Sequence, residues 1–231
     1  GIIIQCLVNF VKKYRVYATY SKEESLGNIP LKIKKSKNLT FIKLDFNSKD
    51  TDIIKILKKK KVKADIIINS VGGTFGIKEY PFDITTWQKQ LDLNFFKHLL
   101  IINHFMKDMI KNRFGRILLF SSHAVDDPKT SITYSAAKAF LENYVKKSSI
   151  IFGKNNILIN CIKTSIVAAK NNNWYKATQQ KPREIKDLMK RTLSVERIGN
   201  AKDFTEIIDL VISEKNQFIN GSILTVDGGI K

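Results

Sequence analysis

Residues 115–138 read GRILLFSSHAVDDPKTSITYSAAK and contain the pattern that decides the fold. The first part, residues 115–121, is a predicted strand of nearly unbroken apolar character. Such a strand is typical of a parallel sheet covered on both faces. The residues that follow predict a helix over 132–152, on which Tyr134 and Lys138 are four positions apart and share one face. The stretch therefore predicts a strand–helix unit of an α/β protein.

The same alternation of apolar runs and helical patterns extends along the whole chain. It predicts one doubly wound, Rossmann-type parallel sheet in a single domain over residues 1–231. The predicted strands span residues 14–19, 41–45, 64–69, 115–121, 156–162 and 222–226, and the predicted helices span 2–13, 51–60, 85–112, 132–152 and 203–213.

The order of the first elements is unusual, because a helix over residues 2–13 precedes the first strand. A doubly wound dinucleotide fold begins with a central strand and a glycine-rich phosphate turn. Removing a central strand would leave two neighbours without backbone partners. We therefore expect that the first strand is missing from this sequence, and that Gly1 and Ile2 are the tail of the glycine-rich turn.

Composition restricts the class of protein. With 231 residues, 43% of them hydrophobic, the chain can bury one large core, and its apolar runs are too short to predict a membrane span. Cys6 and Cys161 are too few for a disulfide framework or a metal site, which favours a reducing cytoplasm. The net charge of +19 fits either an anionic partner or a lysine-rich bias over solvated faces. The even scatter of the lysines favours the second interpretation.

Tyr134 and Lys138 are the candidate catalytic pair. A free tyrosine has a pKa of about 10, and a nearby ammonium favours the phenolate and is expected to lower that pKa. Such a tyrosine can exchange a proton with a carbonyl or alcohol oxygen. The pair alone would more often be a surface feature of a helix. Its position after a strand that ends in Ser121 and Ser122 changes that judgement, because open α/β sheets bind ligands at the carboxyl ends of their strands.

Two further polar features support a ligand site. Asn69-Ser70-Val71-Gly72-Gly73 follows an apolar strand, and its glycines would let the chain pass close to a cofactor, although an ordinary turn is the alternative. Asn94 lies inside a predicted helix, where asparagine is unfavourable. Its side chain is therefore either exposed or has a specific role.

Taken together, these motifs resemble the short-chain dehydrogenase/reductase family, in particular its ketoacyl-carrier-protein-reductase-like branch. The matching pieces occur in the family's order and span nearly the whole chain. They are Asn69-Ser-Val-Gly72, Asn94, Gly115-Arg-Ile with Ser121-Ser122, Tyr134-x-x-x-Lys138, Asn160, Arg197-Ile-Gly199, Asn220-Gly221 and Val226-Asp-Gly-Gly229.

The resemblance implies a role for each matching position. Tyr134 would be the general acid/base, Lys138 would lower its pKa and hold the nicotinamide ribose, and Asn94 would hold a water in a proton relay to Lys138. A serine of the pair would bind the substrate oxygen. The implied cofactor contacts are Asp45 at the adenine, Asn69 and Gly72 along the cofactor, and the backbone of Val167 at the carboxamide.

The choice between the two serines depends on where the alignment is anchored. Counted from Gly115-Arg116 the family's serine falls on Ser122, and counted back from Tyr134 it falls on Ser121. Loops absorb deletions more easily than strands do, so we prefer Ser122.

The end of the first predicted strand bears on the cofactor. An acidic residue there would bind the ribose hydroxyl of NAD. The sequence has Tyr20-Ser21-Lys22 instead, and Lys22 is suited to the 2′-phosphate of NADP, whereas the neighbouring Glu23 and Glu24 leave NAD possible.

The chain departs from the family at several cofactor positions: Ile3 stands at the last glycine of the turn, Thr164-Ser165 replace Pro-Gly, and Ala169 replaces a threonine.

We predict an NADP-dependent oxidoreductase that reduces a small-molecule or carrier-bound carbonyl. The alternative is a non-catalytic relative that binds a nucleotide or nucleic acid. The resemblance also implies a homo-oligomer, a dimer or tetramer. Residues 163–193, which carry Trp174 and Tyr175, are a candidate substrate lid or a plain surface excursion.

Overall fold

The computed structural model describes residues 2–76, 83–170 and 172–231. The chain forms two compact units. The sheet unit comprises Lys63–Ser165 and Ile207–Asp227, and the N-terminal unit comprises Gly1–Val62, Ile166–Glu206 and Gly228–Lys231.

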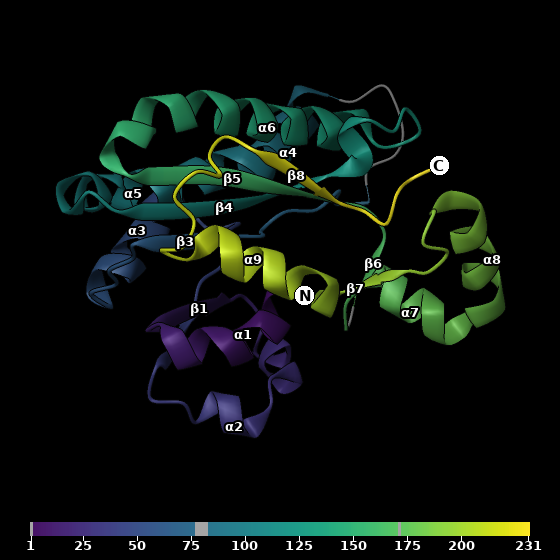
Figure 1. Cartoon of the computed structure of the whole chain (residues 1–231), viewed down its shortest axis with the longest axis horizontal. Helices are drawn as coiled ribbons and strands as arrows, with labels where there is room; N and C mark the ends of the chain where they lie inside the picture. Colours follow the sequence, from purple (N-terminus) through teal and green to yellow (C-terminus); the bar gives the residue numbers. More distant parts are fainter. Residues whose placement is uncertain (1, 77–82, 171) are drawn as a thin grey trace. The chain divides into compact units, whose positions relative to one another are not determined.

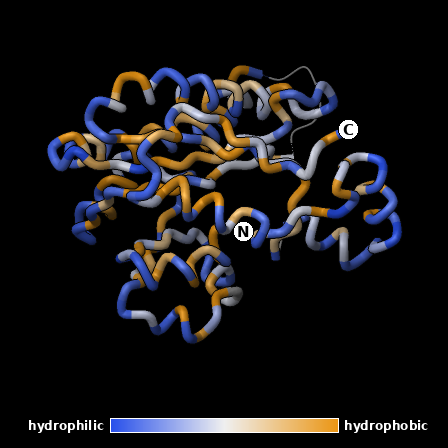
Figure 2. The backbone as a smooth tube through the Cα atoms, viewed as in Figure 1, coloured by the Kyte–Doolittle hydropathy of each residue, from blue (hydrophilic) through white to orange (hydrophobic). Residues whose placement is uncertain are grey.

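The sheet unit contains a four-stranded parallel sheet in the order β3-β4-β5-β8 (Figure 1). Its two central strands, β4 and β5, are nearly all buried, and Figure 2 shows hydrophobic residues along the sheet. Ser122 lies opposite Thr164 in the register, so the carboxyl ends of the two central strands meet at one edge. The strands span Ile66–Asn69 (β3), Gly115–Ser122 (β4), Ile157–Thr164 (β5) and Ile223–Val226 (β8).

Helices cover both faces of this sheet. α5 packs on β4, and α6 packs on β4 and β5, whereas α9, from Ile207 onward, lies on the opposite face (Figure 1). Apolar side chains such as Leu118 and Leu141 fill the space between, where burial of each large side chain contributes about 1.5–3 kcal/mol. The helices span Ile84–Leu91 (α4), Lys97–Asn112 (α5), Ile132–Phe152 (α6) and Thr205–Ile212 (α9).

The helix predicted over residues 85–112 is not continuous. A π-helical turn, Asp92–Phe96, separates α4 from α5 and contains the buried Asn94. A π turn carries an extra residue within a helix and often marks a functional position. Two short 3₁₀ segments complete the unit, His123–Val125 before α6 and Gly153–Asn155 after it.

The N-terminal unit begins with α1, followed by the parallel pair β1 and β2, and β6 pairs with β7. Its elements up to residue 62 are α1 (Ile2–Lys13), β1 (Val16–Tyr20), the 3₁₀ segment Glu23–Asn28, α2 (Leu31–Lys34), β2 (Leu39–Lys43) and α3 (Asp50–Lys59). The later ones are β6 (Val167–Ala168), α7 (Asn173–Gln180), α8 (Pro182–Thr192), β7 (Gly199–Asn200) and the 3₁₀ segment Ala201–Phe204.

The α/β class with a parallel sheet and flanking helices is confirmed. Within the described residues the strands pair as three sheets, with β1 and β2 apart from the four-stranded one. The candidate lid, residues 163–193, contains the end of β5 and the helices α7 and α8. Three predictions are not tested by the structure and stay predictions. They are that residues 163–193 cover a substrate, that the whole chain is a single domain, and that the first strand of the fold is missing from this sequence. No helix in the described ranges is long and apolar enough to cross a membrane.

Candidate active site

The candidate catalytic residues gather where β4 ends and α6 begins. Ser121 and Ser122 are the last residues of β4, and Tyr134 and Lys138 lie one turn apart near the start of α6. All four belong to the sheet unit, and α6 packs directly on β4. The strand–helix unit that the sequence predicted therefore brings these side chains together.

Tyr134 and Ser122 are hydrogen-bonded to each other through their side chains. The Ser122 hydroxyl also accepts a bond from the Ala124 N–H, 3.2 Å away, which leaves its own proton for Tyr134. That bond lowers the pKa of Tyr134, but burial raises it by more, so the net pKa lies above the ordinary value. The sequence-based expectation of a lowered pKa is wrong for this structure, because the desolvation of a phenolate outweighs the groups that favour it.

Lys138 is buried beside this pair. Its Nζ donates to the Phe120 carbonyl at 2.8 Å and lies 5.8 Å from the centre of the Tyr134 ring. Burial lowers the pKa of Lys138 to about 8, so at neutral pH the ammonium form still predominates. A positive charge is thereby held close to the phenol.

Ser121 has a different set of partners from Ser122. Its hydroxyl donates to Glu142 on α6 at 2.6 Å. The same carboxylate lies 3.2 Å from the Lys163 ammonium, which also bonds Asp126 at 2.7 Å. Because Ser121 is buried within this ionic cluster, Ser122 is the serine whose hydroxyl meets Tyr134.

Asn94 is fully buried and joins the glycine segment 72–73 to the helix. Its Oδ1 accepts from the Gly73 N–H at 2.9 Å, and its Nδ2 donates to the Gly73 carbonyl at 3.0 Å. Gly72 has a φ of +147°, and a Cβ added there would lie 2.5 Å from Asn94 Oδ1 and 3.2 Å from Lys138 Nζ. The glycine segment thus passes directly against the candidate catalytic lysine. The water-holding role of Asn94 stays a prediction.

Two neighbours of Asn94 were missed from the sequence. Gln90 and His98 are also fully buried, and they bond the backbone of the same segment, at Thr74 and Val71. The sequence signal that could have found them is their spacing: Gln90, Asn94 and His98 follow one another at intervals of four residues, which places them on one helix face. Polar residues at this spacing normally indicate a solvated face, so the sequence pattern alone pointed the other way.

Asn69 is the last residue of β3 and directly precedes this segment in the chain. Its Oδ1 accepts from the Val71 N–H at 3.2 Å, while its Nδ2 is buried without a hydrogen-bond partner among the described residues. A buried donor without a partner costs free energy, and a bound polar ligand would satisfy it.

The remaining predicted cofactor residues are in the N-terminal unit. Tyr20 ends β1 and donates to Glu23 at 3.1 Å, and Ser21 and Lys22 follow it on the surface. Asp45 accepts from the Asn47 N–H at 3.0 Å in a turn after β2. The other two residues are Val167, whose carbonyl accepts from Asn172 at 2.8 Å, and Ile2, the first residue of α1; Gly1 lies outside the described residues.

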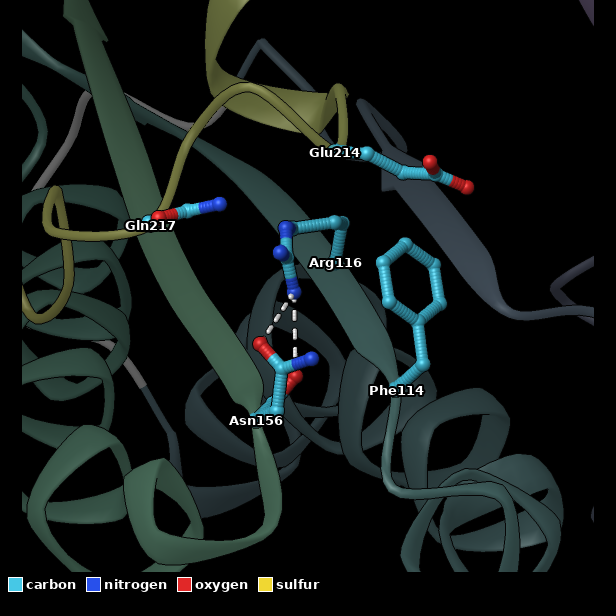
Figure 3. A pocket seen from close by; sticks show the side chains of 5 residues that line it. All are labelled: Phe114, Arg116, Asn156, Glu214 and Gln217. Atoms are coloured by element: carbon cyan, nitrogen blue, oxygen red, sulfur yellow. Dashed lines mark hydrogen bonds between the residues drawn. The ribbon is translucent and has the colours of Figure 1, made fainter.

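Arg116 lies at the opposite, amino-terminal end of β4. Its guanidinium donates to the carbonyls of Gly115, Asn156 and Asn216 at 2.8–2.9 Å. Figure 3 shows the bonds to Asn156 and the ring of Phe114 beside the guanidinium. A small pocket lined by Phe114, Arg116, Asn156, Glu214 and Gln217 opens here. Since backbone oxygens already engage the guanidinium, Arg116 fastens the end of the sheet.

Comparison with known proteins agrees with this geometry. A family profile described as "Enoyl-(Acyl carrier protein) reductase" matches residues 12–231. The 3-oxoacyl-(acyl-carrier-protein) reductase FabG of Aquifex aeolicus is 25% identical over 167 residues, which cover 72% of this chain and 65% of that protein. The L-rhamnose 1-dehydrogenase (NADP(+)) of Thermoplasma acidophilum is 26% identical, over 73% of this chain and 65% of that protein. The chain therefore matches slightly less than two thirds of the length of these relatives.

Solved structures share the fold. ElxO with NADP bound superposes with a TM-score of 0.83 at 23% identity, over 99% of this chain and 93% of that one. A 7α-hydroxysteroid dehydrogenase complexed with NADH and a bile-acid derivative superposes with a TM-score of 0.84 at 21% identity, over 100% of this chain and 90% of that one. The matched profile, the relatives and the Tyr134–Lys138 geometry together show that the chain belongs to the short-chain dehydrogenase/reductase family.

Proposed function

We propose that the protein is an NAD(P)-dependent oxidoreductase that transfers hydride between a nicotinamide and a carbonyl or alcohol, acting mainly as a reductase. The observation that carries the proposal is the phenol of Tyr134, bonded to Ser122 and placed beside the buried Lys138 ammonium. Three groups able to bind one oxygen atom and to move one proton thus share one strand end.

The residues of the sheet unit fit a nicotinamide cofactor. Asn69 offers a buried amide donor without a partner among the described residues, and the absence of a side chain at Gly72 lets the backbone pass directly against Asn94 and Lys138. Lys138 would hold the ribose, and Tyr134 would lie at the reacting end. When bound, the nicotinamide supplies or accepts the hydride. In the N-terminal unit, the proposed contacts are Gly1, Ile2, Tyr20, Ser21, Lys22, Asp45 and Val167.

In the reductive direction, the chain's own residues manage the proton and the developing charge. Burial raises the pKa of Tyr134, so the phenol is protonated at neutral pH and ready to donate. Ser122 binds the carbonyl oxygen and stabilises its negative charge as the carbon receives hydride. Tyr134 then gives its proton to that oxygen, and the Lys138 ammonium stabilises the phenolate left behind.

We propose NADP rather than NAD as the preferred cofactor. Lys22 is exposed at the end of β1, and the adjacent Glu23 carboxylate already bonds Tyr20 and lies 3.9 Å from Lys43. An engaged carboxylate competes less for the ribose hydroxyls, and an exposed lysine favours a 2′-phosphate. The names of one relative and one structural neighbour also include NADP.

The proposed substrate is a carbonyl compound, either small or attached to a carrier, as the FabG names of two relatives suggest. The test follows oxidation of NADPH with a 3-oxoacyl thioester, an oxo-steroid and a sugar lactone as three separate substrates. Turnover of any one supports the proposed chemistry and ranks the substrate classes. NADPH binding without hydride transfer to any of the three would favour a non-catalytic relative that binds a nucleotide or nucleic acid.

The two serines should differ in kinetic effect. We predict that Ser122→Ala lowers kcat by about 10²-fold, the order expected when one oxyanion donor is lost. Ser121→Ala should reduce stability instead, because it removes one hydrogen-bond donor from the buried Glu142 carboxylate. Paired steady-state assays and thermal melts check this. The reverse kinetic order would assign the substrate contact to Ser121.

We also propose a homo-oligomer, a dimer or tetramer, formed through α5 and α6. Phe96, at the end of the π turn before α5, and Phe140 on α6 are each about half exposed, and both rings contact Phe95. Exposed clustered aromatics are typical of protein interfaces. Light scattering at micromolar concentration should give at least twice the mass of one chain, and Phe140→Glu should lower it. A monomeric mass for the wild type would contradict the proposal.

We also propose a cellular compartment for the protein and a role for the candidate lid. Both cysteines are buried and neither forms a disulfide, which supports a reducing compartment such as the cytoplasm. Residues 163–193, with Trp174 on α7, are proposed to cover an apolar substrate.

A further inference from the structure

Three polar side chains with no exposed surface lie at intervals of four residues along α4, the π turn and α5, one in each. They are Gln90, Asn94 and His98, which we call the loop clamp. The inward face of a helix in an α/β protein is normally apolar. Burying a polar group is unfavourable unless it is hydrogen-bonded, so three in succession require partners.

All three residues bond the same short stretch of backbone, residues 71–74. His98 Nε2 lies 2.9 Å from the Val71 carbonyl, and Asn94 pairs with both backbone groups of Gly73. Gln90 donates to the Thr74 carbonyl at 2.7 Å and accepts from Asn94 Nδ2 at 2.8 Å. The clamp thus contacts three of the four loop residues in order along the helix.

The loop depends on these contacts. β3 ends at Asn69, and residues 70–74 belong to no helix or strand. Val71 and Gly73 are half-buried, and their backbone N–H and C=O groups that face the protein rather than water need partners outside regular structure. Here side chains of the neighbouring helix supply them, so the helix determines the path of the loop.

The path matters because Gly72 lies against the catalytic lysine. A Cβ at Gly72 would be 3.2 Å from Lys138 Nζ, so a small shift of the loop changes what the ammonium contacts. Burial and the charge of Lys138 lower the pKa of His98 to about 3. The imidazole is therefore neutral, and its Nε2 carries the proton that is donated to Val71.

We propose that Gln90 and His98 are positioning residues of the active site: with Asn94, they hold residues 71–74 against Lys138 and thereby set the affinity for the nicotinamide cofactor. The part of this inference that concerns cofactor affinity rests on the proposed function. It assigns to Gln90 and His98 an effect on binding that acts through the loop backbone, with no contact of their own to the reacting atoms.

The test compares His98→Leu and Gln90→Met with Ile102→Val. Ile102 lies one turn after His98 on α5, is equally buried, and has no polar atom with which to bond the loop. NADPH affinity is measured by fluorescence titration, and loop order by amide hydrogen exchange of residues 70–76. We expect His98→Leu and Gln90→Met each to weaken NADPH binding by about 10-fold and to speed exchange at Gly73.

His98→Gln provides the rescue, since the Gln Nε2 can replace His Nε2 as the donor to Val71. Affinity and exchange near the wild-type values in this variant would support the clamp. If His98→Leu and Gln90→Met behave like Ile102→Val in both measurements, the proposal is wrong. If the wild type binds no nicotinamide, the proposed function fails together with the cofactor role, while the exchange comparison still decides whether the clamp holds the loop.

Discussion

Tyr134→Phe is expected to lower kcat for carbonyl reduction by about 10²–10⁴-fold, the usual contribution of a positioned acid. The phenol of Tyr134 bonds Ser122 at the end of β4, and phenylalanine keeps the ring while removing the proton donor. NADPH affinity should change little, since the proposed cofactor contacts Asn69, Gly72 and Lys138 stay in place. Single-turnover kinetics and a fluorescence titration separate the two quantities.

Tyr144→Phe is the matched control for this substitution. Tyr144 lies on the same helix and is also largely buried, its pKa is likewise raised by burial, and its side chain bonds Ser148. Removing its hydroxyl should therefore cost similar stability and leave kcat near the wild-type value. Turnover retained by Tyr134→Phe, or lost equally in both variants, would remove Tyr134 from the role of general acid.

Much of the sheet unit could be predicted because its signals are local. The helix over 132–152 was predicted with the bounds that α6 has, and the apolar runs at 115–121 and 156–162 locate β4 and β5 to within two residues. Parallel central strands bury both faces, so their apolar character is continuous and easy to recognise. The spacing of Tyr134 and Lys138 is equally local.

Features that depend on tertiary contacts could not be predicted. The π turn around Asn94 coincides with bonds to Gly73, which is 21 residues away in sequence. The raised pKa of Tyr134 depends on burial, which the sequence does not give. β6 and β7 have two residues each, too short for any periodicity. Gln90 and His98 resembled a solvated face because only the fold reveals what covers them.

Gly72→Ala should be strongly damaging for a substitution that adds a single methyl group. The new Cβ would lie 2.5 Å from Asn94 Oδ1, and the φ of +147° is one that residues with a side chain rarely adopt. Asn94 cannot easily withdraw, because its amide is bonded to both backbone groups of Gly73. We expect a loss of about 1–3 kcal/mol in the free energy of unfolding, as for overpacked sites. We also expect kcat to fall by about 10-fold or more, because Lys138 is displaced.

Gly73→Ala is the control for stability at the adjacent position. A Cβ added at Gly73 meets nothing within 4 Å, so this variant should unfold within about 0.5 kcal/mol of the wild type. Urea denaturation of both variants measures the difference directly. Because the two substitutions add the same methyl group one residue apart, a large gap reports the combined cost of the Gly72 contact with Asn94 and Lys138 and of its φ of +147°. Equal stability of the two variants would mean that the loop can move away from the helix and that Gly72 is not tightly packed against Lys138.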